Sequence, residues 1–234
     1  MWGFVNCTRY YQSFGVPKVV LHEASLVVGT REKLGLLVPP GGGKSTIIKL
    51  LAGIDQPNDG HVLRDAGGWP LGYAGAFRAD LTAEENIHNI AALVGLDPNS
   101  YSAFCMEFSE LGEAYFHPLS LYTGRQRGQL AFAASLGIPA STYLADEKIG
   151  IGDEGFRNKC AQALKARLAT CGLILVASQP RVTEEVCDRH AIVSRGKIIA
   201  CRDHQEAKEL FTMGIAEGGD DEITDEELAS FDLA

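Results

Sequence analysis

Short apolar runs alternate along the chain with segments whose apolar positions recur at helical spacing. The runs Leu34–Val38, Thr142–Ala145 and Gly172–Ala177 hold few polar residues, which is typical of strands buried on both faces of a parallel sheet. Helical periodicity is found in these segments: Ser45–Ala52, Asn86–Leu96, Gln126–Leu136 and one helix within Glu154–Ala169. Strands that alternate with helices predict an α/β fold with a mainly parallel sheet covered on both faces.

Turn and strand signals place the remaining elements of the core. The first 30 residues or so are expected to form N-terminal antiparallel strands and turns, with Val19–Leu21 and Ser25–Val28 as strand candidates. A turn is expected at Gln56–Gly60, and Ile192–Ile199 predicts a hairpin that turns at Arg195-Gly196.

The segment from about residue 82 to 139 differs from its surroundings because it is helical in character. It opens on the capping box Thr82-Ala-Glu-Glu85, in which each end of the motif satisfies a backbone donor of the other. We therefore expect one domain over residues 1–213 that contains a helical subdomain at about 82–139. An acidic tail, expected to be disordered or loosely helical, follows over residues 214–234.

Composition narrows the class of protein. The chain has 234 residues, of which 46% are apolar, and no run of about 18 apolar residues that would span a membrane. No export signal is visible, and the six cysteines lack a ligand pattern, so we expect reduced thiols, mostly in the core. A net charge of −9 argues against nucleic acid as a partner, because phosphate repels such a surface.

The strongest chemical signal is a glycine-rich loop directly after the first apolar run. It reads Pro40-Gly41-Gly42-Gly43-Lys44-Ser45-Thr46. Glycines let successive N–H groups converge on phosphate oxygens, Lys44 adds a charge for the β- and γ-phosphates, and the Ser45 hydroxyl can ligate Mg²⁺. The alternative is a glycine turn that precedes a lysine by chance. The strand before the loop and the helix after it favour a phosphate-binding site.

A second acidic motif supplies what hydrolysis needs besides phosphate binding. Asp146 and Glu147 end the apolar strand Thr142–Ala145, where parallel sheets bind ligands. Asp146 is expected to hold Mg²⁺ or its waters, and Glu147 to polarise the attacking water. The alternative, a strand that ends in a solvated acidic turn, is disfavoured by the glycine loop upstream.

The order of these motifs resembles an ABC-type ATPase. Between them lies Tyr122-Thr-Gly-Arg-Gln-Arg127, similar to the family signature Leu-Ser-Gly-Gly-Gln, and it leads into Leu130-Ala-Phe. Trp69–Thr82 falls at the family's glutamine loop, Gly150–Asp153 at its aspartate loop and Val176–Gln179 at its histidine switch. The resemblance covers about residues 5–212. Within the family, Trp69-Pro-Leu and the segment Gly152–Cys160 most resemble subunits that energise export of capsular and O-antigen polysaccharides.

The resemblance implies a P-loop NTPase fold of the ABC-ATPase type and a dimer that sandwiches two ATP molecules. The loop of one subunit would face the signature residues Thr123, Gly124 and Gln126 of the other subunit. Tyr11 lies where the family stacks an aromatic ring on adenine, although ordinary packing explains a tyrosine in a strand equally well. The implied partners are transmembrane permease subunits and a second ATPase, identical or not. The implied location is peripheral, on the cytoplasmic face of the inner membrane.

Four departures from the family pattern fall on the chemistry. Val38 replaces the first glycine of the loop pattern, and Arg78 replaces the glutamine near Mg²⁺ and the attacking water. Arg125 replaces the second signature glycine, and Gln179 replaces the switch histidine. A guanidinium cannot ligate a metal but can pair with the γ-phosphate, and the Gln179 amide can donate a hydrogen bond to it. These changes predict ATP binding with slow or atypically controlled hydrolysis, unless Arg78 or Arg125 compensates as a cation.

Three functions compete. The first is an ATP-hydrolysing subunit of a polysaccharide exporter. The second is a weakly or non-hydrolysing regulatory subunit paired with an active ATPase. A soluble ABC-type ATPase without a transporter ranks last, because the chain lacks a long coiled-coil insertion or tandem duplication.

Overall fold

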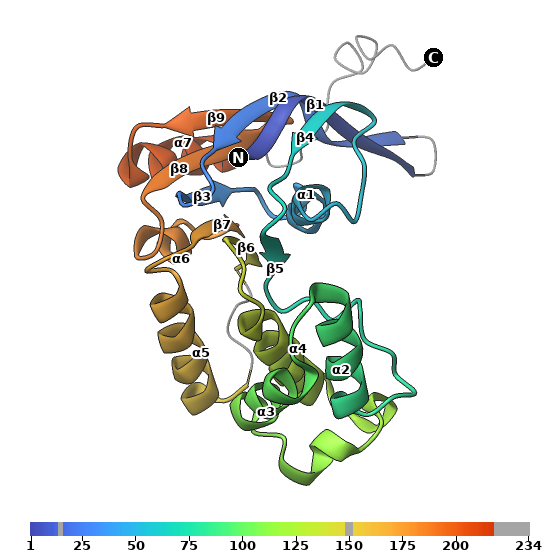
Figure 1. Ribbon diagram of the computed structural model, residues 1–234. Helices are drawn as coiled ribbons and strands as arrows, with labels where there is room; N and C mark the ends of the chain where they lie inside the picture. Colours follow the sequence, from blue (N-terminus) through green and yellow to red (C-terminus); the bar gives the residue numbers. More distant parts are fainter. Residues whose placement is uncertain (14–15, 148–151, 218–234) are drawn as a thin grey trace.

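The computed structural model describes residues 1–13, 16–147 and 152–217. They form two β-sheets stacked around a central helix, with a separate group of helices below them (Figure 1). The strands are β1 (Trp2–Ser13), β2 (Val16–Val28), β3 (Lys33–Leu37), β4 (Asp59–Leu63), β5 (Gly68–Pro70), β6 (Thr142–Asp146), β7 (Gly172–Ala177), β8 (Arg189–Ser194) and β9 (Lys197–Cys201). The α-helices are α1 (Lys44–Leu51), α2 (Ala83–Val94), α3 (Pro98–Ser109), α4 (Gly124–Gly137), α5 (Glu154–Arg167), α6 (Pro180–Glu184) and α7 (His204–Glu217), and 3₁₀ turns are η1 (Gly112–Phe116) and η2 (Leu119–Leu121).

The larger sheet carries the nucleotide motifs. Its strand order is β5-β6-β7-β3-β8-β9, and all neighbours are parallel except β8 and β9. In this order β3 lies beside β7, with Leu36 opposite Val176, so the loop after β3 and the segment after β7 leave the sheet at the same edge. The predicted α/β fold with a mainly parallel sheet is confirmed. The predicted hairpin is also confirmed, since Arg195 and Gly196 both adopt positive φ between β8 and β9.

The smaller sheet is antiparallel, in the order β2-β1-β4, and covers α1 (Figure 1). The two strand candidates of the N-terminal region are parts of the single long strand β2. The turn expected at Gln56–Gly60 ends earlier than predicted, because β4 begins at Asp59. One core of buried apolar side chains joins both sheets to α1; it includes Phe4, Leu21, Leu36, Ile47, Leu50 and Val176.

The helical part runs from α2 to α4, and its helices begin at capping residues. The predicted subdomain at about 82–139 stays a prediction. Thr82 accepts from the Glu85 N–H while the Glu85 carboxylate accepts from the Thr82 N–H, as the capping box predicts. Helix α3 begins at Pro98 with Asp97 as its N-cap. The predicted domain boundary at 213 stays a prediction: α7 runs on to Glu217, and residues 218–234 of the expected tail lie outside the described residues.

Two expectations from composition bear on the described residues. Five of the cysteines are buried and Cys201 is half-buried, all as free thiols. Burial raises the pKa of Cys7 to about 11 and that of Cys105 to about 12, as expected for core thiols. Within the described part of the chain, no helix has the length and apolar character needed to cross a membrane.

Candidate nucleotide site

The glycine loop joins β3 to α1 in a conformation that only glycine adopts without strain at two positions. Gly41 has φ 82° and Gly43, the N-cap of α1, has φ 89°. A Cβ on Gly43 would overlap the side chain of Val20, whereas one on Gly41 would meet no atom within 4 Å. The start of α1 therefore presents bare backbone N–H groups, and the loop leaves room for phosphate oxygens beside them.

Val38, the first departure from the family pattern, is a core residue. Its side chain is fully buried, and its N–H donates to the Ala177 carbonyl at 2.8 Å, which extends the pairing of β3 with β7. The valine thus fills space beneath the loop and leaves the three later glycines in place.

The predicted catalytic carboxylate lies beside the loop lysine. Lys44 Nζ is 3.3 Å from Glu147 Oε1, and both side chains are largely buried. Glu147 also accepts hydrogen bonds from the Ser178 N–H at 2.6 Å and from the Ser178 hydroxyl at 2.8 Å. Burial by itself raises the pKa of Glu147, but the Ser178 hydrogen bonds and the Lys44 charge outweigh it and hold the pKa below its ordinary value. Glu147 is accordingly a carboxylate near neutral pH.

Asp146 is the residue whose environment fits a metal ion. Its Oδ1 is buried and has no hydrogen-bond partner among the described residues, which is costly unless a ligand completes it. Asp146 ends β6, against which α1 packs, and the exposed Ser45 lies in the first turn of α1. A carboxylate and a hydroxyl are the hard oxygen ligands that Mg²⁺ prefers. The donor set therefore fits Mg²⁺.

Tyr11, on β1, contacts α1, the helix that follows the glycine loop. Its hydroxyl lies 3.3 Å from Thr46 Oγ1 and donates to Asp55 Oδ2 at 2.7 Å. The Arg9 guanidinium lies over the Tyr11 ring, 4.3 Å from its centroid. The structure thus brings Tyr11 to the start of α1, and its stacking on adenine stays a prediction.

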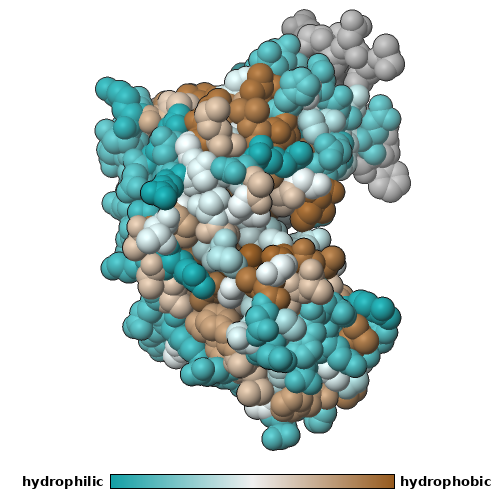
Figure 2. Space-filling model, in the orientation of Figure 1, coloured by the Kyte–Doolittle hydropathy of each residue, from teal (hydrophilic) through white to brown (hydrophobic). Residues whose placement is uncertain are grey.

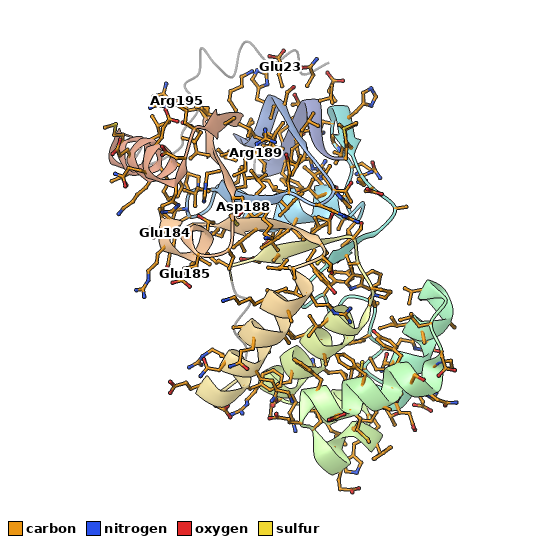
Figure 3. The ribbon with its side chains drawn as sticks, turned by 60° about the vertical axis from the view of Figure 1, so that its left-hand side comes forward. Glu23, Glu184, Glu185, Asp188, Arg189 and Arg195 are labelled. Carbon is orange, nitrogen blue, oxygen red and sulfur yellow. The ribbon has the colours of Figure 1, made fainter. Side chains whose placement is uncertain are left out.

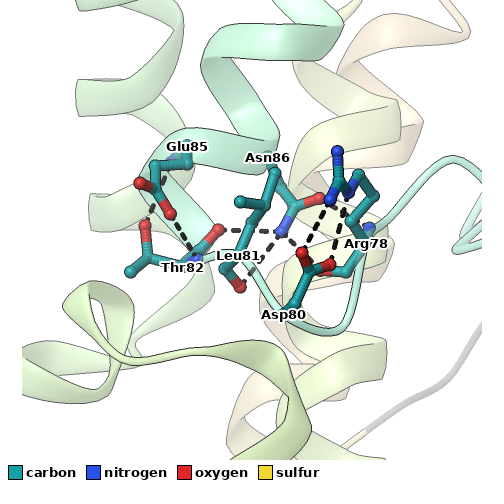
Figure 4. A network of polar contacts seen from close by, with 6 residues as sticks. All are labelled: Arg78, Asp80, Leu81, Thr82, Glu85 and Asn86. Atoms are coloured by element: carbon teal, nitrogen blue, oxygen red, sulfur yellow. Dashed lines mark hydrogen bonds and ion pairs between the residues drawn. The ribbon is translucent and has the colours of Figure 1, made fainter.

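Arg78 lies in a loop whose backbone is hydrogen-bonded by the buried Asn86. Among the described residues, the polar contacts of the Arg78 side chain are with Asp80 and not with the glycine loop. Its guanidinium makes a two-pronged pair with Asp80, with N–O distances of 2.7 and 3.2 Å, and it is largely exposed. Beneath it, Asn86 accepts from the Arg78 N–H and donates to the carbonyls of Arg78, Leu81 and Thr82 (Figure 4). Asn86 therefore fixes the backbone of this loop, a role that sequence analysis did not identify.

The signature turn, residues 122–127, is held by hydrogen bonds between its own residues at the start of α4. Thr123 is the N-cap of α4 and shares a capping box with Gln126, while Gly124, the first helical residue, has open space around it. Arg125 pairs with Asp153, the N-cap of α5, within the same chain. The Asp153 carboxylate accepts from the Phe156 N–H and pairs with Arg125, and these contacts lower its pKa. The aspartate loop predicted at Gly150–Asp153 lies only partly inside the described residues.

Gln179, the predicted switch residue, is exposed at the start of α6 and follows the Ser178 that bonds Glu147. It borders a pocket of about 480 Å³ between α6 and α7, together with Arg181, His204 and Phe211. Glu184 lines the same pocket. Figure 3 shows Glu184 at one side of the core, with Glu185 and Asp188 near it and with Arg195 and Glu23 farther up the view.

The predicted residues fall into two groups. Lys44, Asp146 and Glu147 gather at the sheet edge with Tyr11, and Gln179 follows directly on Ser178. The members of the second group lie in the helical part: Arg78, Thr123, Gly124 and Gln126. The polar contacts of Arg78, Thr123 and Gln126 stay within that part. Figure 2 shows the surface hollowed between these two parts of the molecule.

Three relatives found by sequence comparison are ATP-binding proteins, and two of them are named for export of a polysaccharide or O-antigen. No protein-family model matches the chain. The ATP-binding protein BexA of Haemophilus influenzae is 34% identical over 206 residues, which cover 88% of this chain and 94% of BexA. The capsule polysaccharide export ATP-binding protein CtrD of Neisseria meningitidis serogroup B is 34% identical over 83% of this chain and 90% of CtrD. An O-antigen export system ATP-binding protein, RfbB of Klebsiella pneumoniae, is 30% identical over 85% of this chain and 82% of RfbB.

Solved structures share the fold. The ATP-binding cassette MJ0796, in a dimeric post-hydrolysis state bound to ADP and Pi, matches with a TM-score of 0.71. The match has 20% sequence identity and covers 85% of this chain and 96% of that chain. A second dimeric structure of MJ0796 matches with a TM-score of 0.68. At such identity the likeness shows the fold alone, which is that of an ABC cassette.

Proposed function

The chain belongs to the ATP-binding subunits of ABC transporters that export capsular and O-antigen polysaccharides, and we propose that it binds and hydrolyses Mg-ATP to drive such export. The observation that carries the proposal is the cluster of Lys44, Glu147 and Ser178 beside a glycine loop. The cluster brings the Lys44 ammonium and the Glu147 carboxylate together at one edge of the sheet. This contact supports the proposal that Lys44 binds phosphate and that Glu147, held by Ser178, acts as the base.

Phosphate binding is assigned to the loop Pro40–Thr46. The N–H groups at the start of α1 take the phosphate oxygens, and the Lys44 ammonium takes the charge of the β- and γ-phosphates. Ser45 and Asp146 would hold Mg²⁺, which when bound neutralises charge that develops on the phosphates.

Glu147 acts as the base toward the attacking water. Before ATP binds, Lys44 is paired with this carboxylate at 3.3 Å. When the lysine turns to the γ-phosphate, Glu147 loses one of the groups that lower its pKa and becomes a stronger base. The Ser178 hydrogen bonds keep the carboxylate in position during this exchange. Binding of ATP thereby prepares the base for the reaction.

Turnover is proposed to be slow, because the groups expected around the γ-phosphate are replaced. Gln179 donates a hydrogen bond but cannot take up a proton near neutral pH, and Arg78 is engaged by Asp80. The loss of one positioned donor costs on the order of 10²–10³ in rate.

The proposed assembly follows from the second group of residues. The turn at Thr123 and Gly124 would complete the site of a partner ATPase subunit, so the active form is a dimer with two ATP molecules. The partner is a second copy of this chain or another ABC ATPase. The dimer would dock on transmembrane permease subunits, peripherally on the cytoplasmic face of the inner membrane.

Steady-state Mg-ATP hydrolysis by the purified protein, beside its Glu147→Gln variant, tests the proposal. We expect a measurable rate that falls at least about 100-fold in the variant, with ATP binding retained. A parent rate equal to that of the variant, with binding intact, would contradict hydrolysis and favour a nucleotide-binding regulatory subunit.

A further inference from the structure

Arg9, on β1, is held in place by the loop between α1 and β4. Its Nη2 lies 3.0 Å from Asp55 Oδ2, and its Nη1 donates to Asn58 Oδ1 at 3.2 Å. Asn58 Oδ1 also accepts from the Tyr10 N–H, and the Asn58 N–H donates to the Thr8 carbonyl. The register of β1 against β2 shifts on both sides of Arg9, and such bulges redirect side chains. The guanidinium is thus fixed by two partners that lie 46 (55 − 9) and 49 residues further along the chain.

The same guanidinium covers the ring of Tyr11. Its central carbon lies 4.3 Å from the ring centroid, the geometry of a cation–π contact. Asp55 completes a triangle, because its Oδ2 accepts from the Tyr11 hydroxyl at 2.7 Å and pairs with Arg9. The ring is therefore held by one contact on its face and another at its hydroxyl.

The charges in this triangle keep it closed near neutral pH. Burial raises the pKa of Asp55, but the hydrogen bonds from Tyr11 and Gln56 and the Arg9 charge lower it further, so the carboxylate stays ionised. Arg9 and Asp55 are each about one-fifth exposed, whereas Tyr11 is 37% exposed. The tyrosine thus offers surface to a ligand while its two supports are mostly covered.

The triangle adjoins the phosphate loop. The Tyr11 hydroxyl lies 3.3 Å from Oγ1 of Thr46, which ends the phosphate-loop motif and lies in the first turn of α1. A nucleotide whose phosphates occupy the loop would carry its base past this residue. A rigid ring at that position lowers the entropy lost when a base stacks on it.

We propose that Arg9 and Asp55 are positioning residues that hold Tyr11 as a stacking platform for the base of the nucleotide. This inference rests on the proposed ATP binding. It assigns affinity for the base to the triangle, and affinity for the phosphates to the loop. Arg9 occupies one face of the ring, so the base stacks on the other face.

Calorimetric titration with two probes, Mg-ATP and inorganic tripolyphosphate with Mg²⁺, tests the assignment. Arg9→Gln and Asp55→Asn should each weaken ATP binding by about 3- to 10-fold and leave tripolyphosphate binding within about twofold. Tyr11→Ala should weaken ATP binding by about 5- to 100-fold, the range for loss of a stacked base. In the Tyr11→Ala background, Arg9→Gln should have no further effect, because its target is gone.

Arg189→Gln is the matched control. Arg189 also pairs with a carboxylate, Glu32 at 3.1 Å, but at the opposite end of β3 from the glycine loop, and Figure 3 shows it on the β8 side of the core. This variant should bind both probes like the parent. Urea unfolding of each variant verifies that it is folded. If Arg9→Gln fails to fold, the near-isosteric variant Asp55→Asn still tests the inference.

Three results would overturn the inference alone while the parent binds ATP: unchanged ATP affinity in both variants, equal losses for ATP and tripolyphosphate, or an undiminished Arg9 effect without Tyr11. A parent protein that binds neither probe would instead overturn the proposed function, and the inference with it.

Discussion

Glu147 shows how opposing influences on one residue set the chemistry of the site. Burial favours its neutral form, while Ser178 and Lys44 favour its charged form and prevail, so its pKa lies below the ordinary value of 4.5. A carboxyl group whose pKa is lowered by folding stabilises the fold above its unfolded pKa, and that contribution is lost as the pH falls through the folded pKa. The same contacts that orient the base therefore also stabilise the protein at neutral pH.

Ser178→Ala tests this balance, since it removes the hydroxyl bonds and keeps the backbone N–H bond. The pKa of Glu147 should rise, so the acid limb of the rate against pH should move to higher pH, and kcat should fall by about tenfold. Ser178→Thr retains a hydroxyl and is the control that should keep the parent profile. A profile of kcat/KM that extends below pH 4.5 measures the shift, because the pKa of Glu147 in the parent lies below that value. An unmoved acid limb in Ser178→Ala would refute the assigned role of the hydroxyl.

At the scale of elements, the sequence predicted what depends on local patterns. The strands β3, β6 and β7 are apolar runs, and α2 carries its own capping box, so periodicity and caps sufficed. β4 and β5 escaped prediction because they are short and only partly buried, and alternation is weak in them. In the site, the loop and Glu147 follow from motifs. Ser178 and Arg9 do not, since their partners lie in distant segments of the chain. Asn86 does not either, since its bonds depend on how the loop before α2 folds back on that helix.

The start of α1 depends on glycine for two separable reasons. Gly43→Ala should destabilise the protein by about 2–4 kcal/mol, because alanine is strained at φ 89° and its Cβ overlaps Val20. Gly41→Ala has a similar φ of 82° but open space, so about 1–2 kcal/mol is expected from strain alone. Urea unfolding midpoints measure both. Equal losses would show that the contact with Val20 adds nothing.

The loop that carries Arg78 depends on Asn86. Asn86→Ala removes four hydrogen bonds and leaves an N–H and three carbonyls without this partner, so we expect a loss of about 2–4 kcal/mol in the free energy of unfolding. Thr82→Ala, which removes only the cap of α2, should cost about 1 kcal/mol. Urea unfolding of the two variants compares them, and a smaller loss for Asn86→Ala than for Thr82→Ala would contradict this role.

In the whole molecule, α5 ties the helical part to the core. Arg125 pairs with Asp153 at the start of α5. Lys159, nearly two turns further along the helix, donates to the Phe108 carbonyl at 2.9 Å and pairs with Glu110 at 2.7 Å. Both contacts join α5 to the helices that carry or support the signature turn. That turn and the nucleotide loop lie in different parts of the chain, which suits a site completed by a second subunit.

A substitution at Gly124 tests whether a second subunit completes the site, because it should leave the fold of the single subunit unchanged. No atom would meet a Cβ on Gly124, and a carboxylate at the first residue of α4 suits the helix dipole, so Gly124→Asp should fold normally. In a sandwich dimer the new carboxylate would face the phosphates of the partner's ATP and repel them. Light scattering with Mg-ATP should show the Glu147→Gln variant as a dimer. The double variant Glu147→Gln with Gly124→Asp should be a monomer, and the control double variant Glu147→Gln with Gly124→Ala should be a dimer. ATP affinity of the monomer should be unchanged, because its own loop is untouched. A dimer that persists with Gly124→Asp would place the signature turn outside the nucleotide interface.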